Sequence, residues 1–169
     1  MSSTHRGESA SSPIELTPGE AGIAVMVGVM RHMKAIAHGR RHYGNSKEAF
    51  DKHIEGALGE AAFAKWSGLY WHPTIGDIDK PDFAGLEIRT TKHINGHLFV
   101  YKKDPEDKRF VLITGHLMQR GQDDNVCVWK GYVRGCMSGT IAKQSHYWDE
   151  NRETPCYAIP QGDLSPVEI

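Results

Sequence analysis

Two acidic residues and one basic residue occur close together in the sequence, at a spacing that can support metal chemistry. Residues 86–91 alternate with period two, which predicts a β-strand that carries Glu87 and Arg89. Side chains two residues apart project from the same face of a strand, so Glu87 and Arg89 should face the same way. Gly85 would allow the chain to turn, so Asp82, just before the strand, can approach both.

Two carboxylates that converge in this way repel each other unless a cation separates them. Hard oxygen ligands suit Mg²⁺ or Mn²⁺, so Asp82 and Glu87 are candidate ligands of one such ion. A carboxylate-held Mg²⁺ can lower the pKa of bound water and neutralise charge on a scissile phosphate. Glu60 could supply a third carboxylate if the helix that carries it packs on the same sheet. The alternative is that these acids are solvated surface charges and that Glu87 forms an ion pair with Arg89.

These residues resemble the PD-(D/E)xK superfamily of restriction-endonuclease-like nucleases. The order of its motif is matched by a glutamate expected on a helix, an aspartate before a strand and a Glu-x-Lys-like triplet on that strand: Gly59-Glu60, Pro81-Asp82 and Glu87-Ile88-Arg89. Three further segments are similar to small phage-encoded members: Phe110–Gly115, Lys130–Gly135 and Tyr157–Leu164. The resemblance spans roughly residues 45–165 and implies an α/β fold with a mixed central sheet flanked by helices. It also implies a Mg²⁺- or Mn²⁺-dependent hydrolase that cleaves DNA.

The resemblance assigns a role to each residue of the motif. Asp82, Glu87 and the carbonyl of Ile88 would ligate the metal, and Glu60 would bind the metal or its water. Arg89 stands where the superfamily usually has the catalytic lysine. A guanidinium stays charged, so Arg89 could orient water or stabilise the phosphate but could not act as a general base.

Two other classes of function compete with the nuclease interpretation. One is a nucleic-acid-binding protein that has the same fold without the chemistry. The other is a phage structural or regulatory protein that binds a host protein and no nucleic acid. Metal-dependent nicking of DNA would distinguish the nuclease from the nucleic-acid-binding protein. Salt-sensitive DNA binding would distinguish the nucleic-acid-binding protein from the structural or regulatory protein.

A basic stretch precedes the motif, because residues 21–47 contain no acid. Candidate phosphate contacts are the basic residues of this stretch together with a lysine at the end of the predicted strand: Arg31, Lys34, Arg40, Arg41 and Lys92. The alternative is a solvated helix face whose charge is balanced by acids elsewhere in the chain. The formal net charge of −1 does not by itself indicate a nucleic-acid-binding protein.

Two helices should come before the strands. Thr17 is placed to cap the first, with Pro18 at its first position and Glu20 as the capping-box partner. The apolar residues Ile23, Met26/Val27, Met30 and Met33 recur at helical spacing up to His38-Gly39 and predict a core-packing face. The second helix runs from near Asn45 to residues 66–68, and small residues around Glu60 would let it approach a sheet closely.

The rest of the chain has β character. Apolar or alternating segments predict strands at 69–71, 86–91, 96–100, 110–114, 126–133 and 157–159, with a short helix around 140–147. Helices followed by strands predict one mixed α/β domain over residues 16–169, after a serine-rich disordered tail at 1–15.

Composition limits the class of protein further. The 169 residues are 39% hydrophobic and 24% charged, which is typical of one globular domain. The longest apolar run, Ala24–Met30, is far shorter than the roughly 20 residues of a membrane-spanning helix, and no secretory signal is expected. Three cysteines without a close pair predict reduced, buried thiols. We therefore expect a cytoplasmic protein (in the host cytoplasm if it is phage-encoded) that could form a homodimer.

Overall fold

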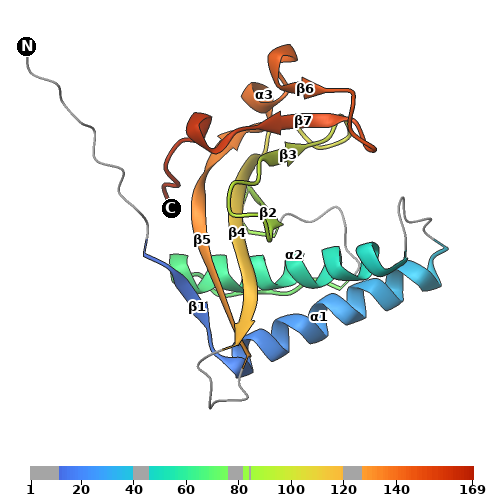
Figure 1. Cartoon of the computed structure of the whole chain (residues 1–169), viewed down its shortest axis with the longest axis vertical. Coiled ribbons are helices and arrows are strands. Elements are labelled where there is room, and N and C mark those ends of the chain that lie inside the picture. The colour runs from blue at the N-terminus through green and yellow to red at the C-terminus, as the bar shows by residue number, and fades with distance from the viewer. Residues whose placement is uncertain (1–11, 40–45, 76–81, 84, 120–126) are drawn as a thin grey trace, which may run out of the picture.

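The structure is a computed structural model that describes residues 12–39, 46–75, 82, 83, 85–119 and 127–169. The predicted site residues Arg40 and Arg41, and Pro81 of the motif, lie outside the described residues. Figure 1 shows the described chain as a curved sheet with two long helices below it and a smaller sheet above.

The main sheet has four strands in the order β1-β5-β4-β2. Their bounds are β1 Ile14–Leu16, β2 Leu86–Thr91, β4 Arg109–Gln119 and β5 Cys127–Ser138. Strand β2 pairs with β4 in parallel, and the other neighbours are antiparallel. The predicted α/β class with a mixed sheet flanked by helices is therefore confirmed, and β2 has the predicted bounds.

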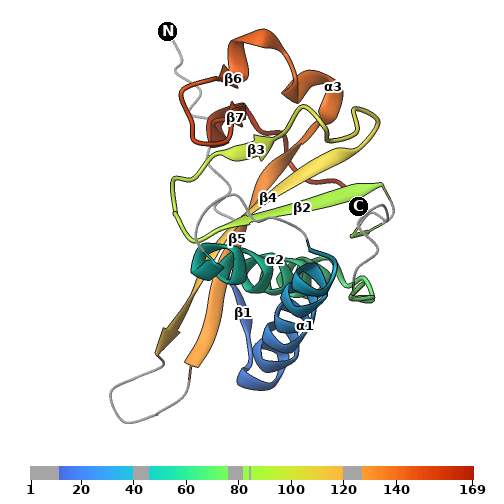
Figure 2. The same ribbon diagram turned by 90° about the vertical axis from the view of Figure 1, so that its right-hand side faces the viewer.

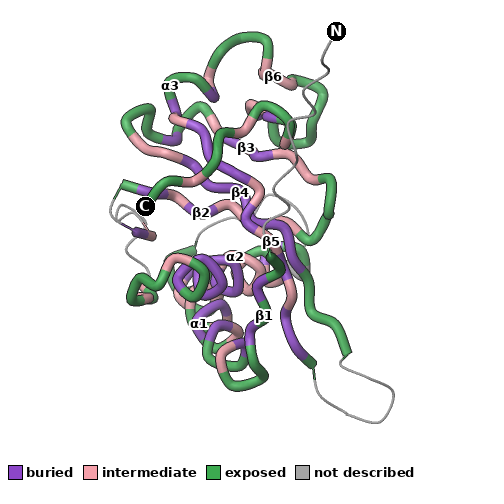
Figure 3. Tube along the Cα trace, turned by 90° about the vertical axis from the view of Figure 1, so that its left-hand side faces the viewer, coloured by how far each residue is buried: buried purple, intermediate pink, exposed green. Residues whose placement is uncertain are grey.

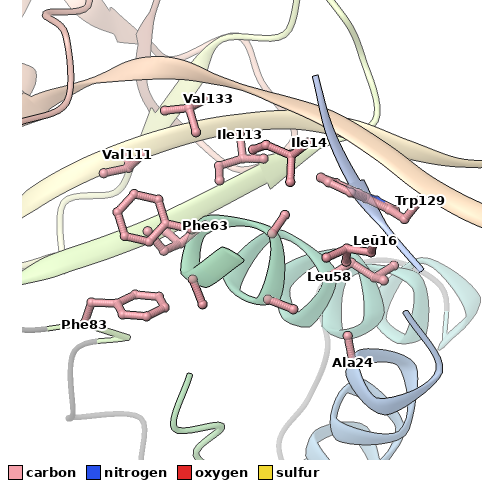
Figure 4. Packing of buried hydrophobic residues seen from close by; sticks show 14 of the residues in the cluster. Ile14, Leu16, Ala24, Leu58, Phe63, Phe83, Val111, Ile113, Trp129 and Val133 are labelled. Carbon is pink, nitrogen blue, oxygen red and sulfur yellow. The ribbon is translucent and has the colours of Figure 1, made fainter. Parts of the chain in front are cut away.

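The two long helices cover one face of this sheet in two layers. Helix α2, Ser46–Ser67, lies against the strands, and helix α1, Pro18–Ala37, lies outside α2 (Figures 1 and 2). Helix α1 begins with the predicted capping box, in which Thr17 and Glu20 bond reciprocally. Phe63 and Leu58 of α2 pack in one buried cluster with strand residues such as Ile113 (Figure 4).

A smaller sheet covers the other face. It has the order β3-β7-β6, and its strands are Leu98–Val100, Cys156–Ile159 and Trp148–Asp149 respectively. Between the sheets lies a second buried cluster that includes Phe110 and Leu112 of β4. The short helix predicted around 140–147 is α3, Gly139–Ala142, followed by a 3₁₀ turn, Ser145–Tyr147; another such turn is Gln161–Asp163.

The predicted close approach of α2 to the sheet occurs at Gly59. A Cβ atom added there would come within 1.8 Å of Thr90 Oγ1 on β2. Any residue other than glycine at this position would force the side chain of Thr90 to shift. Gly59 thus fixes the distance between the helix that carries Glu60 and the strand that carries Glu87.

Four expectations need correction. Residues 14 and 15 of the predicted tail at 1–15 belong instead to β1, in which Ile14 and Leu16 are buried and pair with β5; residues 1–11 lie outside the described residues. Residues 69–71 form no strand. Cys127 is exposed, although Cys136 and Cys156 are buried and free as predicted.

The fourth correction concerns the face of α1 that packs on the core. Val27 of the predicted face is buried, but Ile23, Met26, Met30 and Met33 are exposed. The rest of the buried face is built from small residues: Ala21, Ala24, Gly28 and Ala35. A Cβ atom at Gly28 would come within 2.6 Å of Ile54 Cα on α2. Small residues therefore let the two helices pack closely, and the larger side chains of α1 turn outward. Figure 3 shows α1 at the outer surface, with exposed turns on the side away from α2.

Among the described helices, none has both the length and the apolar character that a membrane crossing needs.

Candidate active site

Asp82 lies beside the free edge of β2. Phe83 and Leu86 exchange two backbone hydrogen bonds, which folds the chain before β2 back along the strand. This turn brings Asp82 Oδ2 within 2.8 Å of the backbone nitrogen of Ile88, which donates to it. The carbonyl of Ile88 points to the same edge as its N–H, because both groups of one strand residue face the same neighbour. A carboxylate and a backbone carbonyl therefore lie along one edge.

The charges around Asp82 are predominantly negative. Burial and the negative charges of Glu60 and Glu87 raise the pKa of Asp82 from 3.8 to about 7. The hydrogen bond from Ile88 and the charge of Arg31 act in the opposite direction without cancelling that effect. A cation placed beside Asp82 would therefore be stabilised.

Glu60 is buried, with 6% of its surface exposed, and it accepts hydrogen bonds from Arg31 of α1 and from Trp71, which follows α2. Arg31 donates from Nη1 to Oε1 at 2.5 Å and from Nη2 to Oε2 at 2.8 Å. Trp71 Nε1 also donates to Oε2, at 3.2 Å. Burial alone would lower the pKa of Arg31, but hydrogen bonds and charge from Glu60 raise it overall. Glu60 is thus a fixed carboxylate that already has a cation.

The described basic residues that were expected to contact phosphate differ in how far they are exposed and in what they bind. Arg31 is largely buried and also donates from Nε to the carbonyl of Thr74, so it belongs to the interior of the site. Lys34 donates to the carbonyl of Ile75 at 2.9 Å. Lys92 is exposed and lies 3.9 Å from a carboxylate oxygen of Glu55. Of these three lysine and arginine side chains, Lys92 is the most accessible to a phosphate.

Glu87 projects from the face of β2 opposite to the helices. Its neighbour Ile88 belongs to the buried cluster on the helix side, so Glu87 turns the other way by strand alternation. In register, Glu87 lies beside Phe110, which belongs to the cluster between the two sheets. Burial raises the pKa of Glu87, and the charge of Arg89 opposes that shift.

The three carboxylates therefore do not converge as expected. Asp82, at the strand edge, is within electrostatic range of both others, but Glu60 and Glu87 approach it from opposite faces of β2. Within the described part of the chain, no group of three or more His, Cys, Asp and Glu side chains is arranged to hold a metal. The donors that fit a hard divalent cation are Asp82, Glu87 and the Ile88 carbonyl, without Glu60 as a direct ligand.

Arg89 lies on the same face as Glu87, as predicted, and is held by a residue that the sequence did not indicate. Its Nη2 donates to Asp104 Oδ2 at 3.0 Å, and its guanidinium carbon lies 5.3 Å from the centre of the Phe110 ring. Asp104 is buried and also accepts from the backbone nitrogen of Tyr101. Arg89 Nε is buried without a hydrogen-bond partner among the described residues. This arginine therefore keeps an unused donor on a fixed, positively charged group.

Two residues that complete the site were missed from sequence: Asp104 and Trp71. Asp104 precedes a proline within a charged turn, where an acid is ordinarily a solvated turn residue. Trp71 was expected in a strand, and its indole reaches Glu60 from an irregular segment instead. Neither position carries a local signal, because each contact joins segments that only the tertiary fold brings together.

In comparisons with known proteins, no family model, curated protein or solved structure matches this chain.

Proposed function

We propose that this chain is a Mg²⁺-dependent phosphodiesterase that cleaves DNA, of the PD-(D/E)xK type. The observation that carries the proposal is the position of Asp82, bonded to Ile88 at the free edge of β2. Burial and the charges of Glu60 and Glu87 raise the pKa of Asp82 to about 7, so a cation bound beside it would be stabilised. Glu87 and Arg89 on the same strand supply the other elements of the motif.

In this proposal each residue of the chain has a distinct role. Asp82, Glu87 and the Ile88 carbonyl would hold Mg²⁺, which would supply an activated water and neutralise phosphate charge. Glu60, fixed by Arg31 and Trp71, would accept a hydrogen bond from a water beside Asp82. Arg89 offers the guanidinium to a non-bridging phosphate oxygen, and it takes no proton because guanidinium does not titrate in this range. Lys92, with Arg40 and Arg41, contacts the DNA backbone. The buried cysteines are compatible with a cytoplasmic protein.

A second candidate is a DNA-binding protein of the same fold that does not cut. The observation that favours it is the ion pair of Arg31 with Glu60, which places a permanent cation in the acidic site. If that guanidinium replaces the metal as counter-ion, the site is structural. The two candidates differ in one property, which is divalent-dependent cleavage.

The test is nicking of supercoiled plasmid in Mg²⁺ and in Mn²⁺, with a chelator as the metal-free control. Asp82→Asn and Glu87→Gln should each abolish cleavage, since each removes a charged ligand while preserving the shape of the side chain. Glu150→Gln is the matched control, because Glu150 is an exposed acid in the turn between β6 and β7. Cleavage that persists in Asp82→Asn, or that is absent from the wild type, contradicts the proposal. Absent cleavage with salt-sensitive DNA binding supports the second candidate.

A further inference from the structure

Helix α1 presents a continuous apolar face to solvent. Its exposed large residues recur every three or four positions and are 46–64% exposed: Ile23, Met26, Met30, Met33 and Ile36. The exposed residues beside them, Gly22 and Ala37, are also apolar. At the Ile23 end, the surface continues to Leu69 and Tyr70 around a hollow of about 330 Å³, which the ion-paired Glu20 and Lys65 also line.

The five large apolar residues of this face have no charged residue among them, and the Glu20–Lys65 ion pair lies at its Ile23 end. The charged side chains of α1 are all engaged by other parts of the molecule: Glu20 by Lys65, Arg31 by Glu60, and Lys34 by the Ile75 carbonyl. An isolated helix of a soluble protein normally carries charges on its solvent side. Arg31 and Lys34 are directed to other parts of the molecule, and Glu20 is paired with Lys65 at one end of the helix, so the solvent side of α1 is mainly apolar.

The order of residue types on this face is the same from either end: Ile, Met, Met, Met, Ile. If two copies of α1 pack antiparallel about a two-fold axis, Met30 meets Met30 of the second copy. Met26 then meets Met33 of the second copy, and Ile23 and Ile36 meet at the same ends of the contact. A two-fold interface must be complementary to itself, and this face satisfies that condition.

The size of the face agrees with such a contact. The stripe is about 20 Å long at 1.5 Å per residue, and with Leu69 and Tyr70 it exposes on the order of 600 Å². This is at the upper limit of the apolar patches that monomers expose. Two such faces bury about 1,200 Å² in total, which reaches the range of specific protein interfaces.

We propose that this face of α1 packs antiparallel on the same face of a second copy, so that the chain is a homodimer. Methionine side chains suit the contact, since their flexible thioethers fill irregular gaps between helices. The inference rests on α1 and the adjoining Leu69 and Tyr70, and it is independent of whether the chain cuts DNA.

Other occupants of the face are less compatible with its chemistry. The segments outside the described residues contain only scattered apolar residues: Met1, Ala10, Tyr43, Ile78, Ala84 and Val126. A helix that binds a lipid surface normally carries lysine and arginine beside its apolar face, but Arg31 and Lys34 are engaged inside the molecule. A second copy needs neither charge nor an additional segment.

The first test measures the mass of the full chain by sedimentation equilibrium at micromolar concentrations. The wild type should be a dimer, and Met30→Glu should raise the dissociation constant at least 100-fold, because two like charges would meet at the axis. Ile94→Glu is the matched control, since Ile94 is 61% exposed and lies between β2 and β3, away from α1. Circular dichroism should show that both variants keep the fold, because both side chains are exposed.

The second test measures the direction of the helices. Met26→Lys and Met33→Glu should each weaken the dimer, and the double variant should restore it, because in an antiparallel pair the new lysine meets the new glutamate. A double variant weaker than either single one would indicate parallel packing and overturn the arrangement. A wild type that is monomeric overturns the dimer itself. If that monomer binds phosphatidylcholine vesicles and folded Met30→Glu does not, a lipid surface covers α1 instead.

Discussion

Arg31 of α1 donates a hydrogen bond to each carboxylate oxygen of Glu60 on α2. This one ion pair joins the two helices and also neutralises an acid of the candidate site. The exposed fraction of the two side chains is 16% and 8%. Because Trp71 also donates to Glu60, the carboxylate has three donors and little freedom to move. The packing of the two helices and the geometry of the site therefore depend on the same contact.

Arg31→Ala should lower the free energy of unfolding by about 3–5 kcal/mol, because it leaves a buried carboxylate without its cation. Glu60→Gln should cost less, since an amide can still accept from Trp71. Chemical denaturation at pH 7 measures both values.

The control for this prediction is an exposed ion pair between the same two helices. Lys65 lies 2.7 Å from Glu20, and both side chains are about two-fifths exposed. Lys65→Ala should change stability by less than about 1 kcal/mol, because solvent screens the pair. Equal losses in Arg31→Ala and Lys65→Ala would contradict the buried character of the Arg31–Glu60 pair.

The local parts of the fold could be predicted because local signals determine them. The capping box at Thr17 and the alternation in 86–91 act within a few residues and depend on no distant contact. The packed face of α1 could not be predicted in this way. Hydrophobicity favours Met26 and Met33 for the core, whereas close packing on α2 requires small residues such as Gly28. Close packing on α2 determines which face of α1 is buried. The sequence of α1 does not show this, because the packing depends on a second helix that only the fold brings alongside.

The glycines of α2 provide a test of the contact between this helix and β2. Gly59→Ala should destabilise the protein by about 1–3 kcal/mol, because the added methyl overlaps Thr90. Gly56→Ala should stabilise it by roughly 0.5–1 kcal/mol, because alanine favours the helix and nothing lies within 4 Å of the new Cβ. Thermal or chemical denaturation measures both. Destabilisation of similar size in the two variants would mean that Gly59 has no special role.

The raised pKa of Asp82 predicts a dependence of stability on pH. Because the pKa is 3.8 for an ordinary aspartate and about 7 in the folded protein, the folded state binds the proton more tightly. The contribution of Asp82 therefore favours the folded state most below pH 4, and it is lost as the pH rises to about 7. Asp82→Asn stays neutral, so it should be more stable than the wild type at pH 8, and the difference should shrink towards pH 4.

Mg²⁺ should reverse this difference if Asp82 is a ligand. At pH 8 the cation would stabilise the wild type and leave Asp82→Asn unchanged, since binding to the folded state alone raises stability. Denaturation curves at several pH values, with Mg²⁺ and with chelator, measure both effects. Parallel curves for the two proteins in chelator would mean that the carboxyl titrates normally.

In the candidate site too, some features follow from local sequence spacing and others depend on the tertiary fold. The placement of Asp82 at the strand and the common face of Glu87 and Arg89 follow from sequence spacing and occur in the structure. The partners of these residues do not follow from spacing. Arg31 and Glu60 are 29 residues apart, and Arg89 and Asp104 are 15 apart, across segments whose approach depends on helix packing and on the second sheet.

The last prediction concerns Arg89, where the sequence departs from the motif that it resembles. If Arg89 acts by its fixed charge, Arg89→Lys should keep or raise cleavage, because an ammonium supplies the same charge and is the usual residue of the motif. Arg89→Ala should lower the rate by a factor of about 10²–10³, by analogy with the loss of one electrostatic donor. Plasmid nicking in Mn²⁺ measures both.

Arg152→Ala is the matched control for Arg89→Ala. Arg152 also lies over an aromatic ring, that of Phe99 at 4.5 Å, and pairs with Asp149 at 2.8 Å. It belongs to the turn between β6 and β7, so its loss should leave cleavage unchanged. If Arg89→Ala cuts like the wild type but is less stable, Arg89 serves only to neutralise Glu87 and Asp104. Cleavage lost equally in both arginine variants would mean that the second sheet, rather than Arg89 itself, controls activity.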